Sequence, residues 1–71
     1  MTDGLKNRVR VMRAEKDISQ DVLANAVGVS RQTIIAIERG NYSPSVTLAL
    51  KIAAYFGVDL EEIFYLADKN V

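Results

Sequence analysis

The sequence predicts the all-α fold class, a compact domain of five short helices, on three observations. Apolar residues recur every three or four positions, glycine or proline interrupts that spacing at short intervals, and a serine or aspartate precedes most of the periodic segments. Such spacing is typical of helices that bury one face, and these polar residues cap helix N-termini. Because 71 residues have room for one core, we expect a single domain over residues 1–71, with its core within about 5–66.

An apolar stripe marks each of the first two predicted helices. Ser19 is the expected N-cap of the second helix, and Gly28 is well placed to end it in the left-handed conformation. Side chains at helical spacing share one face of a helix and are expected to be buried. They are Leu5, Val9 and Met12 in the first helix and Leu23, Ala24 and Val27 in the second.

A proline separates the third and fourth predicted helices. Ser30 is the expected N-cap of the third helix. Pro44 prevents a helix from continuing through it, so the fourth helix begins after Ser43 or Ser45 as N-cap and ends at Gly57. The apolar residues are Ile34 and Ile37 in the third helix and Val46, Leu48, Leu50, Ile52, Ala53 and Phe56 in the fourth.

The last predicted helix is short. Asp59, followed three positions later by Glu62, forms a capping-box pattern that predicts a helix over residues 60 to about 65. Residues 63–66, IFYL, are also of the types enriched in strands, so a short C-terminal strand is an alternative there. The pattern does not decide the structure of residues 66–71.

The second and third predicted helices are joined by only three residues, 28–30. So short a link forces two helices to cross steeply, as in a helix-turn-helix unit. Ala24 is small where such helices approach closely, and Val29 fills the turn. Ile34 and Ile37 are spaced to hold the third helix against the second. We therefore predict a helix-turn-helix unit that begins at residue 20.

The stretch ISQDVLANAVGVSRQTIIAIERGNYSPSVTLALKIAAYFGVDLEEIF, residues 18–64, closely resembles the Cro/CI-type helix-turn-helix family, also called the XRE or lambda-repressor-like family. The resemblance extends back through Val9, Met12 and Arg13 and is closest to small stand-alone members. It implies the five-helix lambda-repressor-like fold. It also implies a sequence-specific regulator of transcription, expected to be a repressor, that binds double-stranded DNA as a homodimer on a pseudo-palindromic operator.

The resemblance implies an ion pair between Arg13 of the first helix and Glu38 of the third. A planar guanidinium can hold a carboxylate through two parallel hydrogen bonds, which would fix the angle of the third helix. The residues alone leave open the alternative of two solvated surface charges. Such a pair orients helices more than it stabilises them, because desolvation offsets much of the attraction.

The family's docking mode implies two groups of DNA-binding residues, because the N-terminal part of the second helix of the unit enters the major groove. Arginine can bind guanine and glutamine can bind adenine through paired hydrogen bonds. The expected base-reading residues are Arg31, Gln32, Thr33, Ile35 and Ala36, of which the last two depart from the polar residues commoner in the family. The expected phosphate contacts are Gln20, Ser30, Arg39, Asn41, Tyr42 and Ser43.

The charge of the chain argues against nucleic-acid binding when taken as a sum. Nine basic residues balance nine acidic ones, and the isoelectric point is about 6.1. The distribution is uneven, however, because seven of the basic residues fall within residues 1–43. The local field steers a polyanion more than the sum does. We interpret Lys6, Arg8 and Arg10 as a solvated face of the first helix.

The composition excludes several classes of function. Without cysteine or histidine there are no disulfides and no thiolate or imidazole metal sites, and we expect no enzyme activity, cofactor or small-molecule ligand. No apolar run is long enough to span a membrane, and the first ten residues do not resemble a signal peptide. A cytoplasmic location is therefore expected.

Two alternative functions are compatible with the same predicted fold. An antitoxin would bind a toxin as well as its own promoter, although such proteins carry an added toxin-binding segment. A helical protein-interaction module would also tolerate a neutral charge. For the homodimer, the expected contact residues are Tyr65 and Leu66, because Ile63 and Phe64 are expected to cover their own core.

Overall fold

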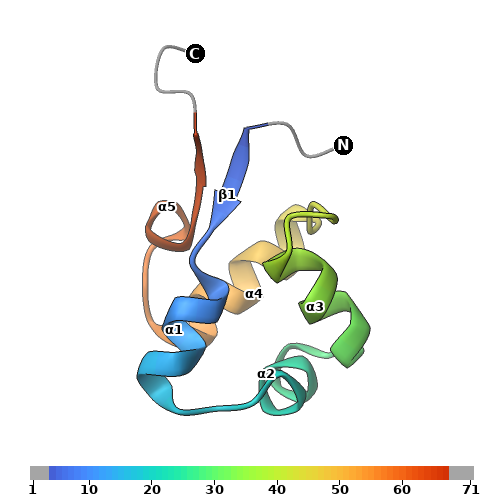
Figure 1. Ribbon diagram of the computed structural model, residues 1–71. Coiled ribbons are helices and arrows are strands. Elements are labelled where there is room, and N and C mark those ends of the chain that lie inside the picture. Colours follow the sequence, from blue (N-terminus) through green and yellow to red (C-terminus); the bar gives the residue numbers. More distant parts are fainter. Residues whose placement is uncertain (1–3, 68–71) are drawn as a thin grey trace.

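The computed structural model describes residues 4–67, and within them the chain folds into five helices and one two-stranded sheet (Figure 1). The predicted helical fold is confirmed, with the small sheet added to it. Residues 68–71, whose secondary structure the sequence pattern left undecided, lie outside the described part. The elements are β1 (Leu5–Asn7), α1 (Val9–Lys16), α2 (Gln20–Val27), α3 (Arg31–Glu38), α4 (Val46–Phe56), α5 (Leu60–Ile63) and β2 (Phe64–Leu66).

Helices α2 to α5 begin after a serine or aspartate, whose side chain can accept hydrogen bonds from free backbone N–H groups, whereas at the start of α1 the Asn7 side chain accepts from the Val9 N–H. Ser19 and Ser30 each accept a hydrogen bond from the backbone N–H three residues on and cap α2 and α3. Of the two serines beside Pro44, Ser45 caps α4, accepting from Leu48 N at 3.1 Å. The Asp59 N–H donates to the Glu62 carboxylate at 2.8 Å, as a capping box requires.

Two sequence predictions about element boundaries are wrong. Leu5 lies in β1 and not in the first helix, and the fifth helix ends at Ile63 because Tyr65 belongs to β2. The strands pair antiparallel, with Leu5 opposite Leu66. The Arg8 N–H donates to the Ile63 carbonyl at 2.9 Å. This pairing commits the backbone around residue 5 to a partner distant in sequence, which no local pattern reveals.

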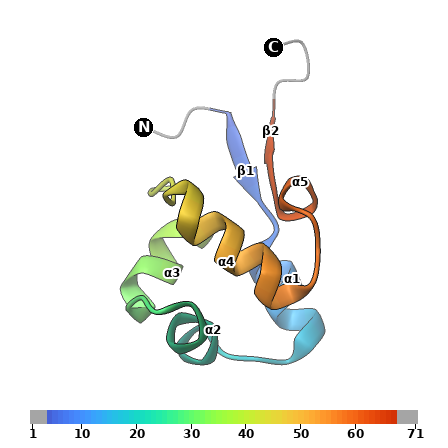
Figure 2. The same cartoon turned by 180° about the vertical axis from the view of Figure 1, so that it is seen from behind.

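The core lies where the five helices meet, below the point where the two strands leave the helices (Figures 1 and 2). α4 runs behind α1 in Figure 1 and in front of it in Figure 2, so it forms the back of the molecule. α2 and α1 pack against α3 and cover one side of it, while Arg31 and Gln32 on its other side stay exposed. The buried residues are Val9, Met12, Leu23, Ala24, Val27, Ile34, Ile37, Leu48, Ala49, Ile52, Ala53, Ile63 and Phe64.

Candidate nucleic-acid interface

The turn between α2 and α3 sets the angle at which α3 leaves the body of the protein. Gly28 ends α2 with φ 80°, a left-handed conformation that glycine adopts without a steric penalty. Val29 packs against the core, and Ile34 and Ile37 of α3 are almost completely buried. The three-residue link and the two buried isoleucines thus hold one side of α3 against the body of the protein.

The leading end of α3 presents polar groups to solvent. Arg31 and Gln32 are exposed, whereas Ile35 and Ala36, one helical turn later, are half-buried. The Thr33 hydroxyl lies 3.1 Å from the Ser30 hydroxyl at the cap. The five residues expected to read bases therefore differ in access to solvent: Arg31 and Gln32 are exposed, Ile35 and Ala36 are less so, and the Thr33 hydroxyl is engaged with the cap.

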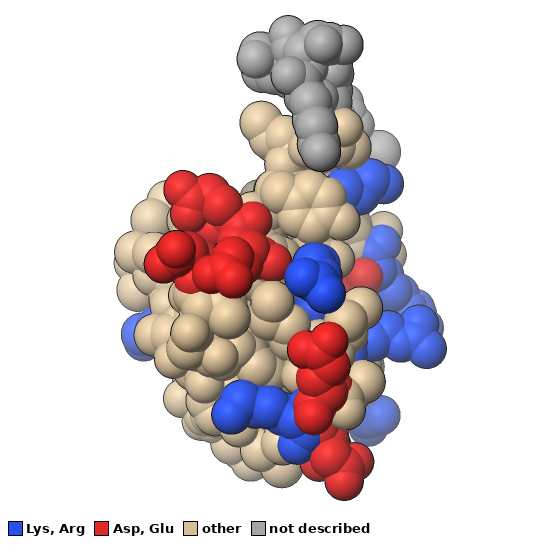
Figure 3. Space-filling view, turned by 90° about the vertical axis from the view of Figure 1, so that its left-hand side faces the viewer, with Lys and Arg blue, Asp and Glu red and all other residues tan. Residues whose placement is uncertain are grey.

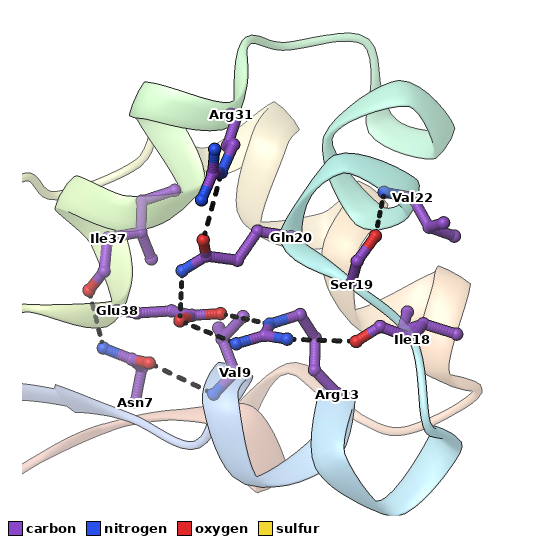
Figure 4. A network of polar contacts seen from close by, with 10 residues as sticks. All are labelled: Asn7, Val9, Arg13, Ile18, Ser19, Gln20, Val22, Arg31, Ile37 and Glu38. Carbon is purple, nitrogen blue, oxygen red and sulfur yellow. Dashed lines mark hydrogen bonds and ion pairs between the residues drawn. The ribbon is translucent and has the colours of Figure 1, made fainter.

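An ion pair ties α3 to α1. Arg13 Nε donates to Glu38 Oε2 at 2.6 Å, and Arg13 Nη2 to Glu38 Oε1 at 3.2 Å (Figure 4). The two side chains are only 16% and 6% exposed. Hydrogen bonding to Glu38 raises the pKa of the Arg13 guanidinium, outweighing the opposing effect of burial. A third bond, from Arg13 Nη1 to the Ile18 carbonyl at 3.0 Å, extends the link to the start of α2.

Gln20 joins this ion pair to the leading end of α3. Its side-chain Nε2 donates to Glu38 Oε1 at 3.1 Å, and its Oε1 faces Arg31 Nε at 3.4 Å (Figure 4). The sequence suggested only a phosphate contact for Gln20. An amide nitrogen carries two hydrogens and Glu38 uses one, so a phosphate contact is still chemically possible.

A hollow of about 700 Å³ opens between α1, α2 and α3. Its lining includes four arginines and two acidic residues, and one of these acids, Glu38, is already paired with Arg13. The hollow is therefore locally basic although the chain is neutral. The residues that line it are Arg10, Arg13, Ser19, Gln20, Asp21, Arg31, Ile35, Glu38 and Arg39.

Arg10 has a second setting that sequence reasoning did not describe. It is exposed, in agreement with the interpretation of a solvated face that includes Lys6 and Arg8, and it also lines the hollow beside the exposed side of α3. The signal was present, because Arg10 precedes Arg13 by three positions and residues so spaced share one face of a helix. Lys6 lies in β1 and not in the first helix.

Charges are unevenly distributed over the surface. Figure 3 shows one group of acidic side chains at the upper left of this face and Lys and Arg along its right-hand edge, with a second acidic group among basic side chains lower down. α5 contributes exposed acids, since Glu61 and Glu62 occupy its first turn. Acids at a helix N-terminus interact favourably with the helix dipole, which accounts for their place.

Comparison with known proteins identifies the fold and the family. The family model described as helix-turn-helix matches residues 9–63, which is most of the chain. This chain belongs to the Cro/CI-type helix-turn-helix family. An HTH-type transcriptional regulator of Methanocaldococcus jannaschii is 53% identical over 64 residues, covering 90% of this chain and 97% of that one.

A transcriptional repressor and a controller protein are also similar to this chain. The cryptic phage CTXphi transcriptional repressor RstR of Vibrio cholerae is 32% identical over 65 residues, covering 92% of this chain and 59% of RstR. The restriction-modification controller protein C.AhdI from Aeromonas hydrophila has a similar crystal structure, with a TM-score of 0.72 and 33% identity over 78% of this chain and 83% of that one. Members of this family are DNA-binding regulators and not enzymes.

The loop that follows α3 in this helix-turn-helix protein holds the other expected phosphate contacts. Arg39, Asn41, Tyr42 and Ser43 are all exposed, and Tyr42 retains 46% of its surface. The Asn41 N–H donates to the Ala36 carbonyl at 2.9 Å, so the loop folds back over the end of α3. Of these four residues, only Arg39 lines the basic hollow.

The two expected dimer contacts lie in β2 on opposite faces of the sheet. Tyr65 and Leu66 are 42% and 51% exposed. Successive residues of a strand point to opposite faces, so Leu66 lies on the same side as the buried Phe64 and Tyr65 on the other. A flat partner surface on one side of the sheet would therefore cover one of the two more than the other.

Within residues 4–67, no helix is long and apolar enough to cross a membrane. The same part of the chain has no group of three or more His, Cys, Asp or Glu residues placed to hold a metal ion.

Proposed function

We propose that this protein is a sequence-specific repressor of transcription that binds double-stranded DNA by placing α3 in the major groove. The observation that carries the proposal is the position of Arg31 and Gln32. They are the exposed residues at the leading end of a helix anchored by its opposite side, next to a hollow with an excess of arginine. The repressor RstR, a relative, supports the direction of regulation.

We assign base reading to the exposed side of α3. Arg31 is suited to the O6 and N7 atoms of guanine and Gln32 to the N6 and N7 atoms of adenine. Ile35 and Ala36 offer apolar contact to a thymine methyl group, and Thr33 is placed to reach a base edge or a phosphate if it leaves Ser30.

We assign backbone contacts to the polar groups around α3. These contacts orient the domain without reading sequence. Ser30 lies at the N-terminus of α3, where backbone N–H groups favour phosphate. The other assigned residues are Gln20, Arg39, Asn41, Tyr42 and Ser43. A protein that acts on DNA in this way would be located in the cytoplasm of a bacterial or archaeal cell.

Selection of binding sites from random duplex DNA tests the proposal. We expect one motif, and we expect Arg31→Ala and Gln32→Ala each to relax the preference at one base pair, at a cost of about 1–3 kcal/mol. If both variants select the wild-type motif, α3 is not the reader. If the wild-type protein binds no DNA even at low salt, the proposal fails as a whole.

We propose further that the protein binds as a homodimer, so that two copies of α3 lie about 34 Å apart on a pseudo-palindromic operator. Tyr65 and Leu66 are the proposed contacts, because both are large and exposed. Leu66→Ser and Tyr65→Ser, measured separately by light scattering, would show which face of the sheet pairs. Val46→Ser on α4 is the matched control, since Val46 is 72% exposed but lies outside β2. A wild-type protein that stays monomeric at micromolar concentration would contradict the proposed dimer.

A further inference from the structure

The basic hollow runs beside α3 along one side of the helix. Residues four, seven and eight positions apart share one face of a helix, and the residues of α3 and its C-cap that line the hollow have this spacing: Arg31, Ile35, Glu38 and Arg39. The opposite wall comes from α1 and the start of α2. The hollow therefore follows α3 from its leading end to its C-cap.

The width of the major groove determines what lies in this space when α3 is bound to DNA. The groove is about 12 Å wide, and an α-helix with its side chains is about 10–12 Å across. A helix in the groove therefore has a phosphate backbone directly beside it. On the side of the hollow, phosphate groups of one DNA strand would lie between α3 and the residues of α1 and α2.

Arg10 of α1 is a cation in this hollow that is not engaged by the fold. It is exposed, and within residues 4–67 its side chain forms no hydrogen bond or ion pair, not even with Asp21, which lines the same hollow. Arg10 precedes Arg13 by three positions, so the two lie about one turn apart on the same face of α1. Arg13 is held against α3 by Glu38, with Nε and Oε2 2.6 Å apart (Figure 4). The ion pair thus fixes the part of α1 that carries Arg10, while the Arg10 guanidinium itself is unpaired.

We propose that Arg10 contacts a phosphate group of the DNA strand that lies along this side of α3. A guanidinium offers paired N–H donors that match two oxygens of one phosphate group. The contact releases no partner within the described fold, because Arg10 has none there. It adds a contact from α1 to those assigned to α2, α3 and the loop after α3. The inference rests on the proposed function, because it assumes that α3 lies in the major groove.

Neutral replacement of single phosphate groups is the first test. In the selected operator, one phosphate at a time is replaced by an uncharged methylphosphonate, and the affinity is measured for the wild type and Arg10→Ala. We expect one position in each half-site where the replacement weakens the wild type but not Arg10→Ala, because the variant has already lost that contact. If every replacement weakens both proteins by the same factor, Arg10 contacts no phosphate, and the inference fails while the proposed function stands.

Salt dependence with a matched control is the second test. Arg8 has the same charge and is exposed two residues before Arg10, but it does not line the hollow. One phosphate contact contributes about 0.9 to the slope of log affinity against log salt concentration. Between about 50 and 200 mM salt, the wild type and Arg8→Ala should therefore lose about 3.5 times as much affinity as Arg10→Ala. A loss of affinity in Arg10→Ala as large as in the other two proteins would overturn the inference.

Two further readouts separate a phosphate contact from base reading and from a loss of stability. Arg10→Ala should weaken binding to the selected operator and to the operator changed at the Arg31 base pair by the same factor, because phosphate carries no sequence information. Its urea midpoint should equal that of the wild type, since the side chain is exposed. Arg10→Lys should keep the salt slope but recover only part of the affinity, because lysine cannot make the paired contact. A changed ratio of the two affinities in Arg10→Ala would contradict a phosphate contact, whereas a wild-type protein that binds no DNA would contradict the proposed function itself.

Discussion

At the scale of the residue, Glu38 makes the contacts that decide how α3 is held. It accepts hydrogen bonds from Arg13 of α1 and Gln20 of α2 and is only 6% exposed. A buried carboxylate that loses its partners retains the cost of desolvation without the attraction that offsets it. The contribution of the pair is therefore seen most clearly when one partner is removed and the other stays.

Arg13→Met should destabilise the fold by about 3 kcal/mol, because it leaves Glu38 buried beside an uncharged side chain. Replacing both residues, as Arg13→Met with Glu38→Leu, should cost less than the sum of the two single changes, because no unpaired charge remains. Urea unfolding followed by circular dichroism at low temperature measures all three variants. Additive losses would mean that the two charges are effectively solvated and do not depend on each other.

Substitutions at the turn residue Gly28 separate the effect of backbone conformation on stability from the effect of packing. Its φ is 80°, and a Cβ added there would meet no atom within 4 Å. Gly28→Ala should therefore cost about 1 kcal/mol through the left-handed conformation alone. Gly28→Asn should cost less, because asparagine tolerates that conformation better than alanine. Thermal unfolding of both variants checks this, and an equal or larger loss for asparagine would point to a steric clash instead.

At the scale of the element, the helices could be predicted from sequence and the sheet only in part. Serine caps, glycine C-caps and apolar spacing are local signals, and they located α2, α3 and α4 closely. β2 was recognised as an alternative from its residue types. β1 was not, because Leu5 follows the helical spacing of Val9 and Met12, and because its pairing with Leu66 joins the two ends of the described chain.

The junction of β1 and α1 was missed for the same reason. The Asn7 side chain accepts from the Val9 N–H at 3.1 Å and donates to the Ile37 carbonyl at 2.9 Å. These two bonds join β1 to the start of α1 and to the last turn of α3. The partner Ile37 lies 30 residues away. Nothing near Asn7 in the sequence marks it as a link to α3. The contact of Gln20 with Glu38 escaped prediction likewise, since it depends on the angle between α2 and α3.

Asn7→Asp isolates the link to α3. Aspartate can still accept from Val9, and its charge favours a helix N-terminus by about 0.3–1 kcal/mol. It cannot donate to Ile37, however. The Ile37 carbonyl keeps the hydrogen bond from the Gly40 N–H at 3.0 Å, so the cost is the loss of one hydrogen bond, about 0.5–1.5 kcal/mol, together with the unfavourable approach of a carboxylate to a carbonyl oxygen. We expect a net loss of about 1 kcal/mol in urea unfolding, with Lys6→Ala, an exposed change in the same strand, close to neutral. A gain in stability for Asn7→Asp would show that the helix terminus outweighs the Ile37 bond.

At the scale of the whole molecule, the neutral total charge proved a poor guide to the surface that a polyanion would meet. The four arginines of the basic hollow come from α1, α3 and the residue after α3. Folding brings them together while Glu38 is neutralised by Arg13. The excess of basic residues in the first part of the chain is visible in the sequence. That Arg10 lines the same hollow as Arg31 and Arg39 depends on how α1 and α3 cross.

The salt dependence of DNA binding tests this local field. The logarithm of the affinity should fall linearly with the logarithm of salt concentration, because each phosphate contact releases counterions. Arg39→Ala removes one cation from the hollow and should reduce that slope by about 1 while weakening binding to all sequences alike. Lys51→Ala is the matched control: Lys51 is exposed on α4 and lines a different hollow, with Tyr55, so its loss should leave the slope nearly unchanged. If the two variants changed the slope equally, total charge and not the arginine-lined hollow would govern the encounter with DNA.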